Sequence, residues 1–156
     1  MNKLLFIIII ILLAIITFGG YKFIIQGSST SVDGRTTIHL SDSERYLILE
    51  EMRGFLTSTQ QIVAAIADDD LEKAAIAAKK VGRAAQAQVP ASLMGKLPMA
   101  FKKLGFDTHT KFDQLALDAE SLEDGSYTLE QLSQLMQNCI ACHATYRLEI
   151  EKKDSM

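Results

Sequence analysis

The stretch TLEQLSQLMQNCIACHATYRLEIE, residues 128–151, contains the pattern from which the fold of this chain can be predicted. Its apolar, cysteine and histidine side chains recur every three or four residues, at Leu132, Leu135, Met136, Cys139, Cys142, His143, Tyr146 and Ile150. Residues at this spacing share one face of an α-helix, so the stretch predicts an amphipathic helix that runs to about Glu151. Thr128 and Gln131 have the spacing of a capping box, which predicts where this helix begins.

Three earlier stretches repeat this period and predict three more helices. They cover about residues 42–67, 71–88 and 98–125. Ser41 and Glu44 form a second capping box before the first of them, and Pro98 suits the first turn of the last. No stretch shows the convincing alternation of a strand, and the links between the later helices are short. The sequence therefore predicts an all-α protein, with an up-down-up-down four-helix bundle over residues 41–156.

Residues 1–25 differ sharply from the rest, because the stretch from Leu4 to Ile25 is almost wholly apolar. A helix of about 20 apolar residues is what a bilayer requires, whereas a cleaved signal usually has an apolar region of about 7 to 15 residues. We therefore expect residues 1–25 to be a membrane anchor or an uncleaved signal, with a cleaved signal as the alternative. Residues 26–40 include many Ser, Thr and Gly and are expected to be a flexible tether.

The flanking charge of the apolar segment predicts where the domain lies. Lys3 favours a cytoplasmic N-terminus and an exported C-terminal domain, so we expect the periplasm, with the domain tethered to the inner membrane or soluble after cleavage. Two of the 16 Lys and Arg residues lie in residues 1–25, so 14 remain against 19 Asp and Glu in the exported part, a balance of −5. A domain of this charge is not expected to bind nucleic acid.

The chain has two cysteines, and both stand with His143 in the segment Cys-Ile-Ala-Cys-His. On a helix, the sulfurs of Cys139 and Cys142 and the imidazole of His143 project from one face. Cys-x-x-Cys-His is the attachment pattern of c-type haem, in which the sulfurs bond the porphyrin edge and the histidine ligates the iron. We therefore expect one covalent haem c, with Cys139 and Cys142 binding the cofactor and His143 binding its iron.

Two other interpretations of the motif remain open. A thioredoxin-like redox pair would use the same two cysteines, but that chemistry accompanies alternating strands and helices, which this sequence does not predict. A structural zinc site would need a fourth ligand, such as His109, beside the two thiolates and His143. No constellation of catalytic acid, base or nucleophile is recognisable, so the chain is not expected to be an enzyme.

With the motif on the last helix of a bundle and followed by Ala-Thr-Tyr-Arg at 144–147, residues 41–151 resemble the cytochrome c-prime family of class II c-type cytochromes. The resemblance implies that His143 is the proximal iron ligand. It also implies that Arg147 lies near the proximal haem face or a propionate, the alternative being an exposed surface arginine. Proteins of this family place either an apolar residue or a methionine over the iron from the first helix, and the resemblance permits a homodimer.

The residue on the other side of the iron decides the function. At 1.5 Å per residue, the level of His143 in its helix corresponds to about residue 50 in the first helix, where Leu49 and Met52 share a face. Met52 would make the iron six-coordinate and suit single-electron transfer between redox partner proteins, which is the function expected here. Leu49 would instead leave an open face for a diatomic gas such as nitric oxide or carbon monoxide. His109 reaches the same level from the third helix and is a third candidate.

Overall fold

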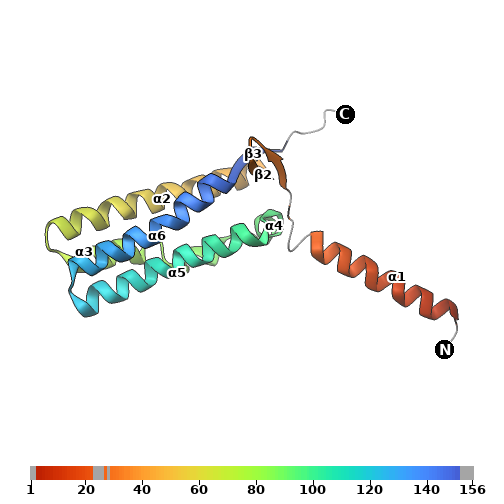
Figure 1. Cartoon of the computed structure of the whole chain (residues 1–156), viewed down its shortest axis with the longest axis horizontal. Coiled ribbons are helices and arrows are strands. Elements are labelled where there is room, and N and C mark those ends of the chain that lie inside the picture. The colour runs from red at the N-terminus through yellow and green to blue at the C-terminus, as the bar shows by residue number, and fades with distance from the viewer. Residues whose placement is uncertain (1–2, 23–26, 28, 152–156) are drawn as a thin grey trace.

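The computed structural model of the chain describes residues 3–22, 27 and 29–151 (Figure 1). In chain order its elements are α1 (Lys3–Gly20), β1 (Ser29–Val32), β2 (Arg35–Leu40), α2 (Asp42–Ala67), α3 (Leu71–Lys79), η2 (Arg83–Gln88), α4 (Ala91–Lys96), α5 (Met99–Leu122), α6 (Gly125–Thr145) and β3 (Tyr146–Ile150). The protein is mostly helical, as the sequence predicts, but it also contains a small sheet. Residues 1–2, 23–26, 28 and 152–156, which include parts of the predicted anchor and tether, lie outside the described residues.

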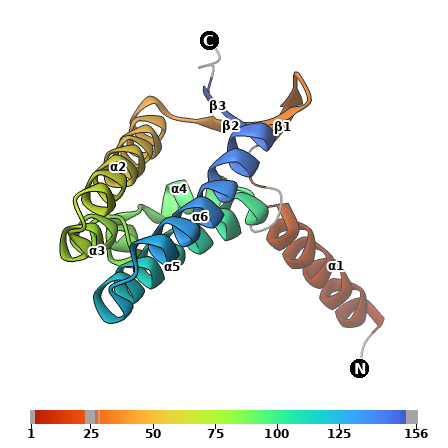
Figure 2. The same ribbon diagram turned by 60° about the vertical axis from the view of Figure 1, so that its left-hand side comes forward.

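Helix α1 is long and apolar enough to cross a membrane, and none of its residues is buried against the rest of the chain. It extends away from the other helices in both views (Figures 1 and 2). These are the properties of a signal peptide or of a membrane anchor. The backbone of Gly27 passes so close to α4 that a Cβ atom would collide with the carbonyl of Lys96. The chain that follows α1 therefore reaches the body of the protein at α4.

The prediction of a flexible tether is wrong for residues 29–40. These residues form a hairpin that belongs to a small sheet, which was not predicted from the sequence. β1 and β2 pair antiparallel across Asp33 and Gly34, whose φ angles of 52° and 79° are those of a tight hairpin turn. Strand β2 then pairs in parallel with β3, from Thr36 opposite Tyr146 to Leu40 opposite Ile150. The partner of β2 lies more than a hundred residues away, so no local window of the sequence reveals the pairing.

The helix predicted over residues 128–151 ends earlier than expected because of this pairing. α6 stops at Thr145, because the next five residues join the sheet as β3. The Tyr146 N–H still donates to the Cys142 carbonyl, but beyond it the backbone pairs with β2, so the helical spacing of Tyr146 and Ile150 is overridden. The Glu151 N–H extends the same edge by donating to the carbonyl of Leu40 at 2.9 Å.

The beginning of α6 also differs from its prediction. The helix starts at Gly125, and the side chain of Asp124 caps it by accepting from the Tyr127 N–H at 3.0 Å. The predicted capping box of Thr128 and Gln131 is therefore wrong. Thr128 is buried inside the helix, and its hydroxyl donates to the Asp124 carbonyl at 2.8 Å.

The first and third predicted helices are confirmed. α2 covers the expected range, and its capping box is present in both directions. The Ser41 N–H donates to Glu44 Oε2 at 2.9 Å, and the Glu44 N–H donates to Ser41 Oγ at 3.3 Å. α5 begins directly after Pro98 and ends close to the predicted Gly125.

The predicted helix over 71–88 is interrupted after nine residues, where α3 gives way to the 3₁₀ helix η2 and then to the short α4. Side chains from α5 bind the backbone at this break. Nδ1 of His109 lies 2.7 Å from the Val81 carbonyl oxygen, and the Arg83 N–H donates to Asp113 Oδ2 at 3.0 Å. Such side-chain bonds compete with helical ones, so the regular helix does not continue.

Two buried clusters hold the helices together. The helical cluster joins α2, α3, α5 and α6, and its largest side chains are Ile62, Phe112, Leu115, Leu132 and Leu135. The sheet cluster consists of Ile38, Leu40, Ile48, Leu93 and Leu97, against which Met52, Val89, Met94, Phe101, Tyr146 and Leu148 pack. Helices α2 and α6 contact each other far less than α2 contacts α3 or α6 contacts α5. The first and last helices of the body are thus connected mainly at the sheet.

Two ion pairs at Lys96 should make the stability of the sheet end of the protein depend on pH. The Lys96 ammonium lies 2.8 Å from Glu44 Oε2 and 2.9 Å from Glu151 Oε1, and the pKa of Glu44 is lowered mainly by its bond to Lys96. A lowered pKa stabilises the fold above the unfolded value of 4.5, and this stability is lost as pH falls through the folded value.

We therefore predict that Glu44→Gln destabilises the full chain in detergent by about 1 kcal/mol at pH 7, the usual size of a lost cap or charged hydrogen bond. The difference from the wild type should shrink in acid, as measured by denaturant unfolding followed by circular dichroism. Glu123→Gln, an exposed carboxylate at the end of α5, is the control and should change little at either pH. An equal loss for Glu44→Gln at pH 7 and pH 3 would contradict the assignment.

Candidate functional site

The two cysteines lie one turn apart on α6 and continue its buried stripe. Leu132 and Leu135 belong to the helical cluster, Tyr146 packs on the sheet cluster, and the half-buried Cys139 and Cys142 fall between them on the same face. Both thiols are free. The cysteines therefore face inward in the interval between the two buried clusters.

Their surroundings are those of buried thiols rather than reactive ones. Burial raises the pKa of Cys139, and burial together with the neighbouring Cys139 raises the pKa of Cys142 to about 11. Catalytic thiols of thioredoxin-like pairs have lowered pKa values, because the thiolate is the attacking species. The local environment thus disfavours the thioredoxin-like interpretation.

His143, the third residue of the motif, is exposed in the last turn of α6. Within residues 3–22, 27 and 29–151, no hydrogen bond or ion pair engages its imidazole. A neutral imidazole nitrogen without a hydrogen-bond partner keeps its lone pair for a metal. Two inward thiols followed by such an imidazole match the donor set of a c-type haem, so the residues fit that group.

His109 is placed differently from His143. It is 1% exposed, with Nδ1 2.7 Å from the Val81 carbonyl oxygen and Nε2 3.1 Å from Glu51 Oε1. Its ring lies 4.9 Å from that of Phe55. Burial alone would lower the pKa of His109, but its bonds to Glu51 and Val81 outweigh burial, and the pKa is raised. Both ring nitrogens are therefore already used, which leaves none for iron or for a zinc site with the motif.

The two candidates on α2 are both half-buried. Met52 packs against the sheet cluster, to which Tyr146 at the end of α6 also belongs. The Tyr146 hydroxyl has a raised pKa, caused by burial and then by the nearby Cys142. The same cluster thus links the surroundings of Met52 with those of the motif. Leu49, one turn earlier, is not among the residues of either cluster.

Arg147 is held by the sheet. Its guanidinium lies 3.1 Å from Asp33 Oδ2 in the hairpin turn and also pairs with Glu149. Asp33 binds Arg35 as well, at 2.9 Å, and the pKa of Asp33 is lowered to about 2, mainly by Arg35. In this arrangement Arg147 connects β3 to the turn between β1 and β2, a role that its motif position does not suggest.

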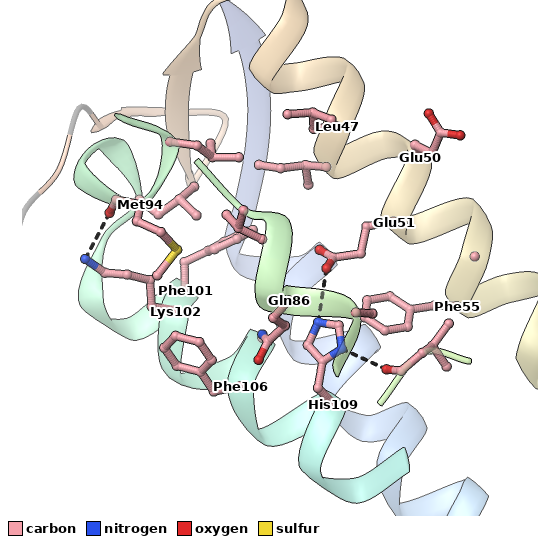
Figure 3. Close-up of a pocket in the computed structure, with 18 of the residues that line it drawn as sticks. Leu47, Glu50, Glu51, Phe55, Gln86, Met94, Phe101, Lys102, Phe106 and His109 are labelled. Atoms are coloured by element: carbon pink, nitrogen blue, oxygen red, sulfur yellow. Dashed lines mark hydrogen bonds and ion pairs between the residues drawn. The ribbon is translucent and has the colours of Figure 1, made fainter. Parts of the chain in front are cut away.

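A cavity of about 370 Å³ lies between α2, η2, α4 and α5 (Figure 3). Its walls are mostly apolar, and Glu51 and His109 lie at one side of it. Cys139, Cys142 and His143 do not line it. Sequence reasoning missed this cavity; the available signal is a pair of glycines, Gly54 and Gly105, inside otherwise regular helices.

No family model matches the chain, and neither the curated proteins nor the solved structures include a match to it. The function is therefore inferred from the chemistry of the site.

We predict that His109 is a structural residue whose loss is costly. Replacing it by Ala removes a buried ring and leaves the Val81 carbonyl and Glu51 without their partner, so the free energy of unfolding should fall by about 2 to 4 kcal/mol. Denaturant unfolding of the full chain in detergent measures this. Lys103→Ala, on the exposed face of the same helix, should cost less than about 0.5 kcal/mol. Equal effects of the two substitutions would show that His109 does not stabilise the break after α3.

Proposed function

We propose that this chain is a c-type cytochrome that carries one haem on α6. Cys139 and Cys142 would each form a thioether with a haem vinyl group, and His143 would ligate the iron. The observation that carries the proposal is the placement of this motif: two inward-facing thiols between the buried clusters, next to an exposed imidazole with no partner among the described residues. When bound, the haem would supply one-electron chemistry.

The arrangement of the helices supports this proposal. α2, α3, α5 and α6 are four helices that pack in order, with the motif on the last, as expected of a cytochrome c-prime-like bundle. α2 and α6 contact each other little. Leu49, Met52 and both cysteines are only half-buried, so the faces that carry them are partly open. A flat apolar cofactor fixed to α6 would cover these faces.

We further propose Met52 as the sixth ligand and single-electron transfer as the activity. Met52 shares the sheet cluster with Tyr146, which follows the motif, whereas both nitrogens of His109 are used elsewhere. A thioether ligand gives low-spin iron that changes little on reduction, a property of electron carriers. Leu49 in this position would instead leave the iron open to nitric oxide or carbon monoxide, and the experiment below separates the two.

The apolar helix α1 and Lys3 at its start support an exported domain that lies in the periplasm and is tethered to the inner membrane. Such a tether keeps an electron carrier close to membrane-bound redox partners, because a linked partner is present at a high effective concentration. Assembly of c-type haem outside the cytoplasm agrees with this location.

Covalent attachment is tested by expressing the chain in a bacterium that exports and assembles c-type cytochromes. The wild type should retain haem on a denaturing gel, because only a covalent bond survives there. The double variant Cys139→Ala/Cys142→Ala should lose it completely, whereas Ala141→Ser, an exposed change inside the same motif, should keep it. A wild-type band without haem would refute the proposed function.

The identity of the sixth ligand is tested by optical spectra of the haem-loaded chain. The wild type should give a low-spin ferrous spectrum with sharp split bands that carbon monoxide does not change. Met52→Leu should become high-spin and bind the gas, because the thioether is lost at nearly constant volume. Met136→Leu, a half-exposed methionine on α6, should leave the spectrum as in the wild type. A wild type that already binds carbon monoxide would favour the gas-binding function with Leu49 over the iron.

A further inference from the structure

The cavity between α2, η2, α4 and α5 is large enough for a substituted ring. Its volume is about 370 Å³, whereas an engineered apolar cavity of about 150 Å³ already binds benzene. Gly105 lies within α5, where glycine costs about 1 kcal/mol relative to alanine. A Cβ atom at Gly105 would meet nothing within 4 Å, so close packing does not require glycine there. The sequence thus keeps space open at a cost in helix stability.

One side of this cavity is polar. The Val81 carbonyl can only accept, so Nδ1 of His109 donates to it, and Nε2 lies 3.1 Å from Glu51 Oε1. Figure 3 shows Glu51 and His109 facing each other at this side, with Met94 and Phe101 across the cavity. A ligand with an apolar ring and a hydroxyl group could donate a hydrogen bond to the Glu51 carboxylate while its ring fills the apolar part.

The opposite wall lies toward the membrane segment. Leu93, Met94 and Leu97 line the cavity from α4 and the residue after it. The backbone of Gly27, a few residues after the apolar helix α1, lies against Lys96 and Leu97. This wall of the cavity therefore lies on the side of the body at which the chain arrives from α1.

The cavity is also next to the motif, across α5. Asn138, which precedes Cys139, donates to the hydroxyl of Thr108 at 3.2 Å and to Asp107 Oδ2 at 2.7 Å. The residue after Thr108 is His109, which lines the cavity. The cysteines and the cavity thus lie at the same level of the body, on two sides of one helix.

From these observations we propose that the cavity binds the ring of a membrane quinol. This compound class combines lipid solubility, a six-membered ring and hydrogen-bonding oxygens, and the choice of an electron donor rests on the proposed function. The ring occupies the space beside Gly105, a hydroxyl of the quinol donates to the Glu51 carboxylate, which His109 holds in place, and the apolar tail leaves past α4. The proposal concerns binding and names the class of donor for the cytochrome.

The test is the binding of a quinone with one isoprenoid unit, kept in its reduced quinol form under anaerobic conditions, to the full chain in detergent micelles, measured by calorimetry with protein-free micelles as the blank. Saturable binding at one site per chain is expected for the wild type. Gly105→Leu should weaken it by at least about tenfold, because the new side chain fills the cavity. Ala100→Leu adds the same side chain to an exposed position of α5 and should bind within about twofold of the wild type.

Ala85→Leu, which enters the cavity from η2, is a second blocking variant if Gly105→Leu does not fold by circular dichroism. Absence of wild-type binding, or unchanged binding in a folded blocking variant, would overturn the proposal. So would equal displacement of the quinone by a ten-carbon fatty acid, because the site would then recognise any apolar chain.

The haem-free variant Cys139→Ala/Cys142→Ala separates this proposal from the proposed function. It should still bind the quinone, because the motif does not line the cavity. Quinone binding by a wild type that carries no haem would refute the cytochrome and keep the site. Covalent haem in a chain that does not bind quinone would do the reverse.

Discussion

The parallel pairing of β2 with β3 is the constraint on which the arrangement of this protein depends. It joins residues 36–40 to residues 146–150, with the whole helical body between the two strands. The pairing joins the strand that leads into α2 to the strand that follows α6, and Figure 2 shows these two helix ends apart, with the sheet between them. Because α6 ends at Thr145, Cys142 lies about 5 Å before the end of its helix, whereas Met52 lies about 15 Å after the start of α2. The two helices share the helical cluster but contact each other little.

His109 imposes a second constraint from inside the body. Its bond to the Val81 carbonyl holds the chain in an irregular conformation where the sequence favours continued helix. The segment that would have completed the second helix becomes η2 and α4, and these form one side of the cavity. Two side chains of α5, His109 and Asp113, thus bind the backbone at the break. Nε2 of His109 is paired with Glu51 and would have to release that carboxylate to bind a metal.

The helices whose ends are set by local sequence signals were predicted well. The capping box of Ser41 and Glu44 and the proline before α5 act within one turn, so their effects can be read from neighbouring residues. The errors have long-range causes. The break after α3 depends on α5, and the end of α6 depends on the hairpin near the N-terminus. Thr128 is a residue type that often caps helices, but it lies inside α6, because the Asp124 side chain caps the helix at an earlier position.

A Cys-x-x-Cys-His motif at helical spacing, an apolar N-terminal helix and a mostly helical fold can all be recognised in the sequence alone. These properties depend on residues within a few positions of one another. The inward direction of the thiols between two buried clusters, the pairing of His109 and the place of Arg147 in a sheet became visible in the folded chain. In the folded chain a cavity also lies across α5 from the motif. Each of these depends on contacts between distant segments, which no local pattern records.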